Sequence, residues 1–348
     1  MNLDTILEPF AINIRRRQIA PLSGGLINRT WKISDGPDQY ILQRINDAVF
    51  KEPEKIDENI SRISEYLETH HPGYFFVAPL HDRLGQSLAH HPDGYFRLMP
   101  FVKDSITIDT VTNPEQAYEA AKQFGLFTKL LSGFDAQTLH TTIPDFHNLS
   151  LRYAQFQKSL SYGNRERIAE TRAVIDTLEE YQWIVNDFEA IKKNSGFSVR
   201  VTHHDTKISN VLFDQKGKGI CVIDLDTVMP GYFISDVGDM IRTYVSPANE
   251  EERSFERISV RVKVFESLVR GYLEFMGDEL TGTEKEYIHY SGMFMTYMQA
   301  LRFLTDYLNN DVYYGSRYDG HNRVRAMNQV HLLNALRDTE KTIQTGIS

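Results

Sequence analysis

The alternation of apolar and polar residues divides the chain into a strand-rich first third and a helical remainder. Residues 29–34 show the two-residue period of a half-buried strand, and residues 17–22 and 40–45 are expected to be the strands before and after it. The glycine-containing segment 23–28 separates the first two strands, and the turn cluster 35–38 separates the second from the third. This order predicts antiparallel strands with a tight glycine loop, whose backbone N–H groups suit a ligand.

The same third of the chain contains one helical pattern and two more predicted strands. Apolar residues recur at three- and four-residue spacing over 53–69, and Pro53 suits an early helical position. Residues 75–80 and 94–99 are expected to be strands. The strand pattern then stops, so we expect a domain boundary here, between residues 1–99 and residues 100–348.

The rest of the chain is expected to be mainly helical, with short strands inside residues 198–231. Helical apolar spacing predicts helices in five segments, of which the second contains one or two: 114–132, 165–194, 250–276, 284–308 and 323–343. Antiparallel strands followed by helices place the chain in the α+β class.

Composition and charge exclude several classes of function. The 348 residues carry a formal net charge of -9, which argues against a nucleic-acid-binding surface. A single cysteine, Cys221, rules out an internal disulfide framework. Neither a signal peptide nor a run of 18 apolar residues is apparent, so we expect a cytoplasmic protein that has no membrane partner.

The segment T-H-H-D-T-K-I-S-N-V-L-F-D, residues 202–214, contains the most specific chemical pattern. Asp205 lies in a short loop, Asn210 follows five positions later, and an apolar strand starts at Val211. A second apolar strand then leads to Asp224. Phosphoryl transfer uses such a set, because one carboxylate orients the attacking hydroxyl while an amide and a second carboxylate hold Mg²⁺.

Three other aspartates near this pattern have less specific roles. Asp224 and Asp226 point to the same side of an extended chain, so Asp226 is a second metal ligand, an acceptor for a substrate hydroxyl, or a turn cap. Asp236 and Asp239 lie where a helix is expected to start. Helix capping is the favoured role of Asp239, and Asp236 is also a candidate brace for the catalytic loop.

The end of the helix near residue 308 brings polar and aromatic residues close together in sequence. Arg302 and Asp306 are four positions apart, and an ordinary surface ion pair is slightly favoured for them. Tyr307 and Tyr314 follow, and several planar and polar groups at one helix end also suit a sugar pocket.

Several motifs together resemble a known family. H-x-D-x-x-x-x-N followed by I-D resembles the aminoglycoside phosphotransferase and choline kinase superfamily, which has a protein-kinase-like fold. Six segments within residues 15–335 resemble bacterial N-acetylhexosamine 1-kinases in order: S-G-G-L-I-N-R-T-W, Y-I-L-Q-R-I-N, H-D-T-K-I-S-N-V-L-F-D, V-I-D-L-D-T-V-M-P-G, D-V-G-D-M-I-R and A-L-R-F-L-T-D-Y-L-N-N-D-V-Y-Y.

The resemblance implies an N-terminal sheet lobe with one helix, a larger helical lobe, and ATP between them. Asp205 is then the catalytic base, and Asn210 and Asp224 hold Mg²⁺. The acceptor is the anomeric hydroxyl of N-acetylglucosamine or N-acetylgalactosamine, and the product is the sugar 1-phosphate. The residues implied in nucleotide binding are Ser23, Gly24, Gly25, Asn28, Gln43, Arg44, Glu58, Met99 and Phe101. Those implied in substrate binding are Asp226, Arg302, Tyr307, Tyr314 and Lys207.

One position departs from the superfamily pattern. Many members carry a lysine on the third strand that is held by a glutamate of the next helix, whereas Gln43 and Arg44 stand there in this chain. The N-acetylhexosamine kinases share this Q-R pair. Arg44 with Glu58 is the candidate replacement, Gln43 offers a neutral hydrogen bond, and Lys207 is an alternative source of charge.

Other functions remain open at this point. A kinase of the same fold would act on an aminoglycoside, on an amino alcohol such as choline, or on another sugar. A pseudokinase-like nucleotide-binding protein is disfavoured because Asp205, Asn210 and Asp224 are all present. A protein kinase is disfavoured because the D-F-G and A-P-E signatures are absent from the sequence.

Overall fold

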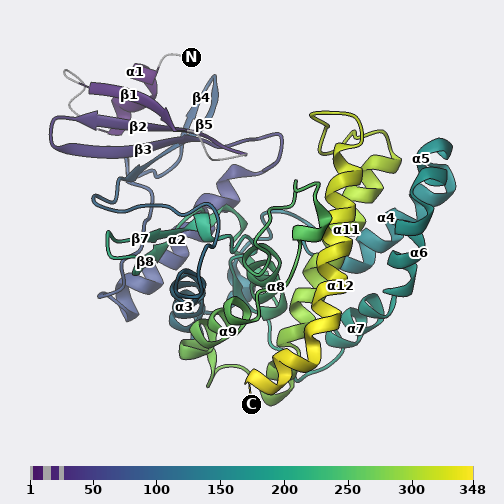
Figure 1. The fold of residues 1–348 in the computed structure, drawn as a ribbon. Coiled ribbons are helices and arrows are strands. Elements are labelled where there is room, and N and C mark those ends of the chain that lie inside the picture. The colour runs from purple at the N-terminus through teal and green to yellow at the C-terminus, as the bar shows by residue number, and fades with distance from the viewer. Residues whose placement is uncertain (1–2, 11–16, 23–26, 348) are drawn as a thin grey trace. The chain divides into compact units, whose positions relative to one another are not determined.

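The structure is a computed structural model that describes residues 3–10, 17–22 and 27–347 (Figure 1). It contains two compact units, each assembled from three segments of the chain. The first unit consists of Met1–Ile106, Gly133–Pro144 and Leu212–Pro230. The second consists of Thr107–Ser132, Asp145–Val211 and Gly231–Ser348. The proposed boundary between residues 99 and 100 stays a prediction.

A five-stranded antiparallel sheet forms the centre of the first unit. Its strands lie in the order β1-β2-β3-β5-β4 and are β1 (Arg17–Leu22), β2 (Arg29–Asp35), β3 (Asp38–Arg44), β5 (Gly94–Pro100) and β4 (Ala89–His91). One face buries Ile33, Leu42 and Leu98 against a short N-terminal segment, α1 (Leu3–Leu7) with η1 (Glu8–Phe10). The alternating residues therefore form the predicted sheet because one side of each strand packs into this core.

The predicted strand over residues 75–80 is wrong. The structure has no strand there, and the segment makes one backbone bond to the sheet, from Leu80 N to Leu98 O (2.7 Å). Pro79 has no N–H to donate to a neighbouring strand. The short strand β4 takes the place beside β5 instead.

A long helix and a small hairpin complete the first unit. Helix α2 (Pro53–His70) starts with proline in its first turn and buries Ile56, Ile60, Ile63 and Leu67 on one face, as predicted. The hairpin is made by β7 (Val211–Phe213) and β8 (Gly219–Val222). Two 3₁₀ turns, η3 (Ala136–Thr138) and η5 (Leu225–Thr227), also belong to this unit.

The second unit is mainly helical. Its elements are α3 (Pro114–Leu130), α4 (Leu149–Tyr162), α5 (Arg165–Glu170), α6 (Arg172–Glu180), α7 (Trp183–Ile191), β6 (Arg200–Thr202), η4 (Ile208–Asn210), α8 (Phe233–Tyr244), η6 (Phe255–Arg257), α9 (Val262–Met276), α10 (Gly282–Glu286), α11 (Ile288–Leu308) and α12 (His321–Ile347). A further short strand, β9 (Met229–Gly231), lies where the chain enters this unit. The mixed α and β architecture with an N-terminal antiparallel sheet is confirmed.

Helix α11 is the central element of the second unit. It packs against α12, α8 and α4 and is buried on nearly every side, which explains its aromatic and apolar sequence (Figure 1). Gly238 of α8 permits the closest approach, since a Cβ atom there would lie 2.3 Å from the backbone oxygen of Ser291.

The helical predictions need three corrections, and the first is that residues 165–194 contain three helices, α5, α6 and α7, and not one or two. The helix expected over 250–276 begins only at Val262, because residues 250–261 form turns and the 3₁₀ segment η6. Helix α4 was not predicted. Its apolar residues Leu149, Tyr153, Phe156 and Leu160 do recur at helical spacing, although the helix buries only Leu149, Phe156 and Ser159. Within residues 3–10, 17–22 and 27–347, we find no helix whose length and apolar character suit a membrane span.

Candidate active site

The loop between β6 and η4 positions Asp205 through backbone contacts to a buried carboxylate. The backbone N–H of His203 donates to Asp236 Oδ2 (3.0 Å) and that of His204 donates to Asp236 Oδ1 (2.7 Å). His204 has a φ of 64°, a left-handed conformation that is unfavourable for a residue with a Cβ atom. Asp236 therefore holds a strained turn immediately before Asp205, which supports its predicted bracing role.

A second buried carboxylate holds the residue after Asp205. Thr206 N donates to Asp239 Oδ2 (2.9 Å), and the hydroxyl of Tyr244 donates to the Thr206 backbone oxygen (2.7 Å). Asp239 is paired in turn with Arg242 (3.1 Å). The favoured capping role for Asp239 is wrong, because this residue lies inside α8 and braces the catalytic loop.

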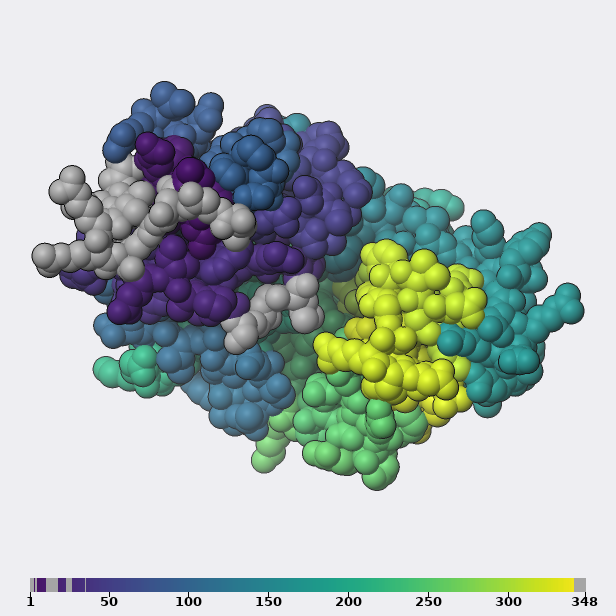
Figure 2. All heavy atoms as spheres, turned by 90° about the horizontal axis from the view of Figure 1, so that it is seen from above, coloured from purple at the N-terminus to yellow at the C-terminus, as the bar shows by residue number. Residues whose placement is uncertain are grey.

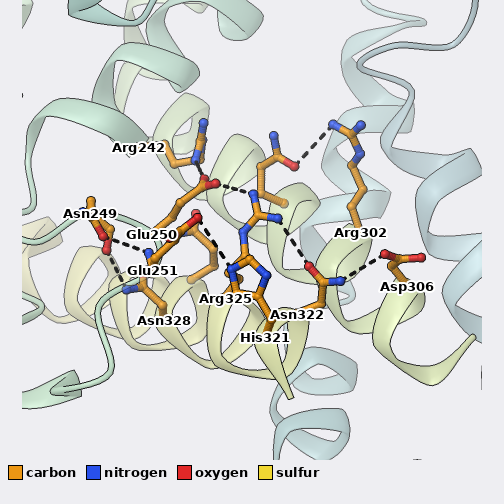
Figure 3. Close-up of polar contacts among 12 residues, drawn as sticks. Arg242, Asn249, Glu250, Glu251, Arg302, Asp306, His321, Asn322, Arg325 and Asn328 are labelled. Carbon is orange, nitrogen blue, oxygen red and sulfur yellow. Dashed lines mark hydrogen bonds and ion pairs between the residues drawn. The ribbon is translucent and has the colours of Figure 1, made fainter. Parts of the chain in front are cut away.

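Burial changes the acidity of both bracing carboxylates. It raises the pKa of Asp236 to about 7, although the backbone N–H groups of His203 and His204 act in the opposite direction. Burial also raises the pKa of Asp239, against the charge of Arg242. Arg242 bonds a further carboxylate, Glu250, at 3.0 Å, as the close-up in Figure 3 shows.

Asp205, Asn210 and Lys207 come together as predicted for the catalytic loop. The side-chain nitrogen of Asn210 donates to the backbone oxygen of Asp205 (2.8 Å) and to its Oδ2 (3.0 Å). The ammonium group of Lys207 lies 3.2 Å from the same Oδ2. Because the Asn210 nitrogen faces Asp205, its amide oxygen is available to a cation.

Gly231 packs directly against the catalytic loop. A Cβ atom at this position would lie 2.5 Å from Nε2 and 2.7 Å from Cε1 of His204. These distances are shorter than van der Waals contact. The observed position of the His204 ring is therefore compatible only with glycine at position 231.

The two aspartates after β8 have different environments in the first unit. Asp224 is exposed and has a φ of 61°, whereas Asp226 is 2% exposed. The amide oxygen of Asn210 and the carboxylate of Asp224 are both hard oxygen ligands of the kind that Mg²⁺ prefers. The described ranges contain no cluster of three or more histidine, cysteine, aspartate or glutamate residues with metal-binding geometry.

Asp226 forms a buried ion pair that the sequence did not predict. Its Oδ1 lies 2.5 Å from a guanidinium nitrogen of Arg97, and both side chains are 3% exposed. The side-chain amide of Asn28 donates to Asp226 Oδ2 (2.7 Å). Arg97 also donates to Gln43 Oε1 through Nε (3.0 Å) and a second nitrogen (2.8 Å). The structure thus brings Asn28, Gln43 and Asp226 together around Arg97.

Arg44 and Glu58 do not form the proposed pair in the described structure. Arg44 Nε donates to the backbone oxygen of Asp93 (2.5 Å). Glu58 instead contacts His140 (2.7 Å) and Arg62 (3.6 Å). The charged side chain that meets Gln43 is Arg97, because Gln43 and Arg97 are directly opposite in the β3–β5 register.

The remaining predicted nucleotide contacts are Ser23, Gly24, Gly25, Met99 and Phe101. Ser23, Gly24 and Gly25 fall outside the described residues. Met99 pairs with Ile41 in the sheet, and Phe101 N donates to Gln39 O (3.1 Å) just beyond the end of β5.

Two of the predicted substrate residues, Arg302 and Tyr314, line a cavity of about 490 Å³ in the second unit. Tyr307 is not among the residues lining this cavity, because its hydroxyl donates to Glu170 and its ring packs on Arg167. The expected surface pair between Arg302 and Asp306 is wrong. Asp306 accepts the backbone N–H groups of residues 313 and 314, and Figure 3 shows it turned toward Asn322.

Sequence reasoning missed Arg97 and two cations of α4, Arg152 and Lys158. Arg97 interrupts the apolar residues of a correctly predicted strand, and a charge at such a position signals a buried partner. Arg152 and Lys158 line the cavity from a helix that was not predicted, so no sequence pattern connected them to Arg302.

Comparison with solved structures shows the same fold in several phosphotransferases. An aminoglycoside phosphotransferase from Alicyclobacillus acidocaldarius matches with a TM-score of 0.67 and 11% identity, over 99% of this chain and 97% of that chain. A spectinomycin phosphotransferase in complex with ADP and spectinomycin matches with a TM-score of 0.63 and 12% identity, over 96% and 97%. A choline kinase from Cryptosporidium parvum matches with a TM-score of 0.61 and 14% identity, over 98% and 97%.

These likenesses establish the protein-kinase-like fold, and the sequence itself establishes the family. Residues 18–257 match the model of the phosphotransferase enzyme family. This range includes the catalytic loop, the two aspartates after β8 and most of the sheet. The chain therefore belongs to the phosphotransferase enzyme family, as a small-molecule kinase of the aminoglycoside phosphotransferase and choline kinase type.

Proposed function

We propose that this protein transfers the γ-phosphoryl group of ATP to the anomeric hydroxyl of an N-acetylhexosamine. The observation that carries the kinase part is the geometry of Asp205, which is held between two braced residues and contacted by Asn210. The sugar part is supported by the resemblance of the sequence motifs and by the position of Arg302 and Tyr314 in one cavity.

In the proposed reaction, Asp205 accepts the proton of the anomeric hydroxyl. The sugar oxygen attacks the γ-phosphorus, the bond to the bridging oxygen breaks, and ADP leaves. The braced loop places the carboxylate before the substrates bind, so positioning supplies much of the catalysis. Lys207, which lies beside Asp205, offers positive charge to the transferring group.

Asn210 and Asp224 are the residues that would hold Mg²⁺. When held there, Mg²⁺ would neutralise charge on the phosphate oxygens of the nucleotide. Arg97 is a buried cation of the sheet that lies opposite Gln43, and its pairing with Asp226 fixes its orientation. We propose that this ion pair organises the nucleotide-binding side of the first unit.

An acceptor panel tests the proposed function. The panel measures Mg²⁺-dependent ATP consumption with N-acetylglucosamine, N-acetylgalactosamine, glucose, galactose, kanamycin and choline. We expect turnover of the two N-acetylhexosamines, with a sugar 1-phosphate product identified by NMR. Turnover of kanamycin or choline alone would retain the kinase chemistry and reject the sugar assignment.

The metal site has an independent test in the variant Asp224→Ala. We expect this variant to lose the Mg²⁺-dependent part of nucleotide binding, because a carboxylate ligand is removed. Calorimetric titration with ADP, with and without Mg²⁺, measures that part directly. Unchanged Mg²⁺ dependence would move the metal site to other residues.

A further inference from the structure

The cavity that contains Arg302 is formed by one face of α4, the end of α11 and the segment after α11. Its volume of about 490 Å³ is typical of a small-molecule site. The lining residues are Arg152, Gln155, Lys158, Ser159, Tyr162, Arg302, Thr305, Asp306, Asn309, Tyr313 and Tyr314. In Figure 2 the yellow-green segment after α11 lies at the surface beside the teal helices, where Asn310 and Asp311 contact the start of α5.

The charges that line this cavity are unbalanced. Arg152, Lys158 and Arg302 are cations, and Asp306 is the one carboxylate among the lining residues. Asp306 Oδ1 accepts the N–H of Tyr313 (2.7 Å), while Oδ2 accepts the N–H of Tyr314 (2.8 Å) and the amide of Asn322 (3.1 Å). Its lone pairs are committed to holding the segment after α11.

Of the three cations, Arg152 has one nearby carboxylate, Asp145, whose charge raises its pKa less than burial and the charge of Arg302 lower it. None of the three cations forms an ion pair within 4.0 Å in the described chain. Arg302 donates to the neutral amide of Gln299 (3.3 Å), and Figure 3 shows its guanidinium group directed away from Asp306. Arg152 donates to Gln155 Oε1 (3.1 Å) and to the backbone oxygen of Asp145 (2.8 Å).

Two donor groups at the cavity are also unsatisfied. Nε of Arg152 and the hydroxyl of Thr305 are buried and have no hydrogen-bond partner in the described part of the chain. Burial lowers the pKa of Arg152, and the neighbouring charge of Arg302 lowers it further. Buried donors and mutually repelling cations are unfavourable unless a negatively charged group binds between them.

The cavity is connected to the catalytic loop through one aromatic ring. The Arg302 guanidinium carbon lies 5.8 Å from the centre of the Phe146 ring. The same ring lies 6.5 Å from the ring of His204, which precedes Asp205. One aromatic ring thus lies between Arg302 and the residue before Asp205, and the largely exposed Tyr162 and Tyr313 form the rim of the cavity.

We propose that this cavity binds a carboxylate or phosphate group of the acceptor, so that the substrate is an acidic N-acetylhexosamine. The proposal rests on the proposed function, because it specifies the acceptor of the same reaction. It also predicts poor acceptance of cationic molecules such as aminoglycosides and amino alcohols, which the three cations would repel.

The test compares kcat/KM for four acceptors at low ionic strength. N-acetylmuramic acid carries a carboxylate, N-acetylglucosamine 6-phosphate carries a phosphate, N-acetylglucosamine is neutral and glucosamine is cationic. We expect at least one acidic sugar to exceed the neutral sugar by roughly tenfold or more, the gain typical of charged hydrogen bonds. The two acidic sugars separate the carboxylate from the phosphate as the preferred group.

Two variants that each remove one positive charge test whether the preference for acidic sugars arises in the cavity. Lys158→Gln removes an exposed cation of the cavity, and we expect the ratio of acidic to neutral kcat/KM to fall about fivefold or more. Arg165→Gln removes an exposed cation of α5 that does not line the cavity, and we expect it to leave the ratio unchanged. Equal use of acidic and neutral sugars, or an equal effect of both variants, would overturn the proposal.

A binding measurement separates this proposal from the proposed function. If no sugar is phosphorylated, the proposed function fails. Calorimetric titration with N-acetylmuramic acid and with N-acetylglucosamine 6-phosphate then tests the cavity alone. Binding that Lys158→Gln weakens and Arg165→Gln does not would still support the acidic site, and absence of binding to both sugars would overturn it.

Discussion

The charges around Asp205 and the charges around the cavity between α4 and α11 are balanced in different ways. Beside the catalytic loop, Asp236 accepts two backbone N–H groups, and Asp239 is paired with Arg242. In the cavity, Arg152 and Arg302 have only neutral partners in the described chain. The buried carboxylates beside Asp205 thus have charged or backbone partners, whereas the two arginines of the cavity donate only to neutral groups in the described chain.

The largest effect is expected when Asp205 itself is changed. Asp205→Asn keeps the size of the side chain and removes the base, so we predict that kcat falls by roughly 10²- to 10⁴-fold. Steady-state kinetics with ATP and the best acceptor of the panel measure this loss. Nucleotide affinity and thermal stability should stay close to wild type, and Asp278→Asn, on the surface, is the matched control. Near-normal turnover in Asp205→Asn would remove this residue from the mechanism.

The next largest effect is expected at the buried ion pair of the first unit. Arg97→Met leaves Asp226 buried without its cation, which should cost about 3–5 kcal/mol of unfolding free energy. Urea unfolding gives this value. The double variant Arg97→Met with Asp226→Leu should recover part of the loss, because it removes both charges together. A loss below about 1 kcal/mol in the single variant would mean that the pair is not a structural requirement.

The pattern along the chain predicted those parts of the site whose members are close in sequence. Asp205, Lys207 and Asn210 were found because one short loop brings them together. The contact of Asp239 with this loop and the Arg97–Asp226 pair depend on tertiary contacts, which the periodicity of the sequence does not reveal. Rules based on residue spacing also gave wrong predictions where backbone groups decided the structure.

Asp306 illustrates that last failure. Four-residue spacing favoured an ion pair with Arg302, yet the two oxygens of Asp306 accept backbone N–H groups of the segment after α11. Residues 75–80 are a second example. Their side chains favour a strand, but Pro79 has no N–H to donate to a neighbouring strand. The sheet, α2 and most of the helices were predictable because their burial follows one regular period.

A smaller effect is expected from crowding the braced loop without removing any of its polar groups. Gly231→Ala places a methyl group where the ring of His204 lies, so the turn before Asp205 must shift. We predict a stability loss of about 1–3 kcal/mol and a reduced kcat, with nucleotide affinity little changed. Gly282→Ala is the control, since a Cβ atom there meets no atom within 4 Å. Equal kinetics in the two variants would show that the loop tolerates displacement.

The smallest effect is the pH dependence of stability that arises from the buried carboxylate of Asp236. Burial raises the pKa of Asp236 to about 7, whereas an aspartate in the unfolded chain titrates near pH 4. Between these values the native state binds more protons than the unfolded state, so this group's contribution to stability falls as pH rises through the window.

The variant Asp236→Asn lacks that titration. The unfolding free energy of wild type minus that of the variant should therefore decrease from pH 5 to pH 8, by at most about 1.4 kcal/mol per pH unit. Urea unfolding at four pH values measures the slope, and Asp278→Asn, at an exposed position, is the control variant. A difference that stays flat between pH 5 and pH 8 would show that the two N–H donors of the loop outweigh burial and keep Asp236 ionised in the native state. Asp236 would then carry its negative charge throughout this pH range, and its protonation would not affect the stability of the catalytic loop near neutral pH.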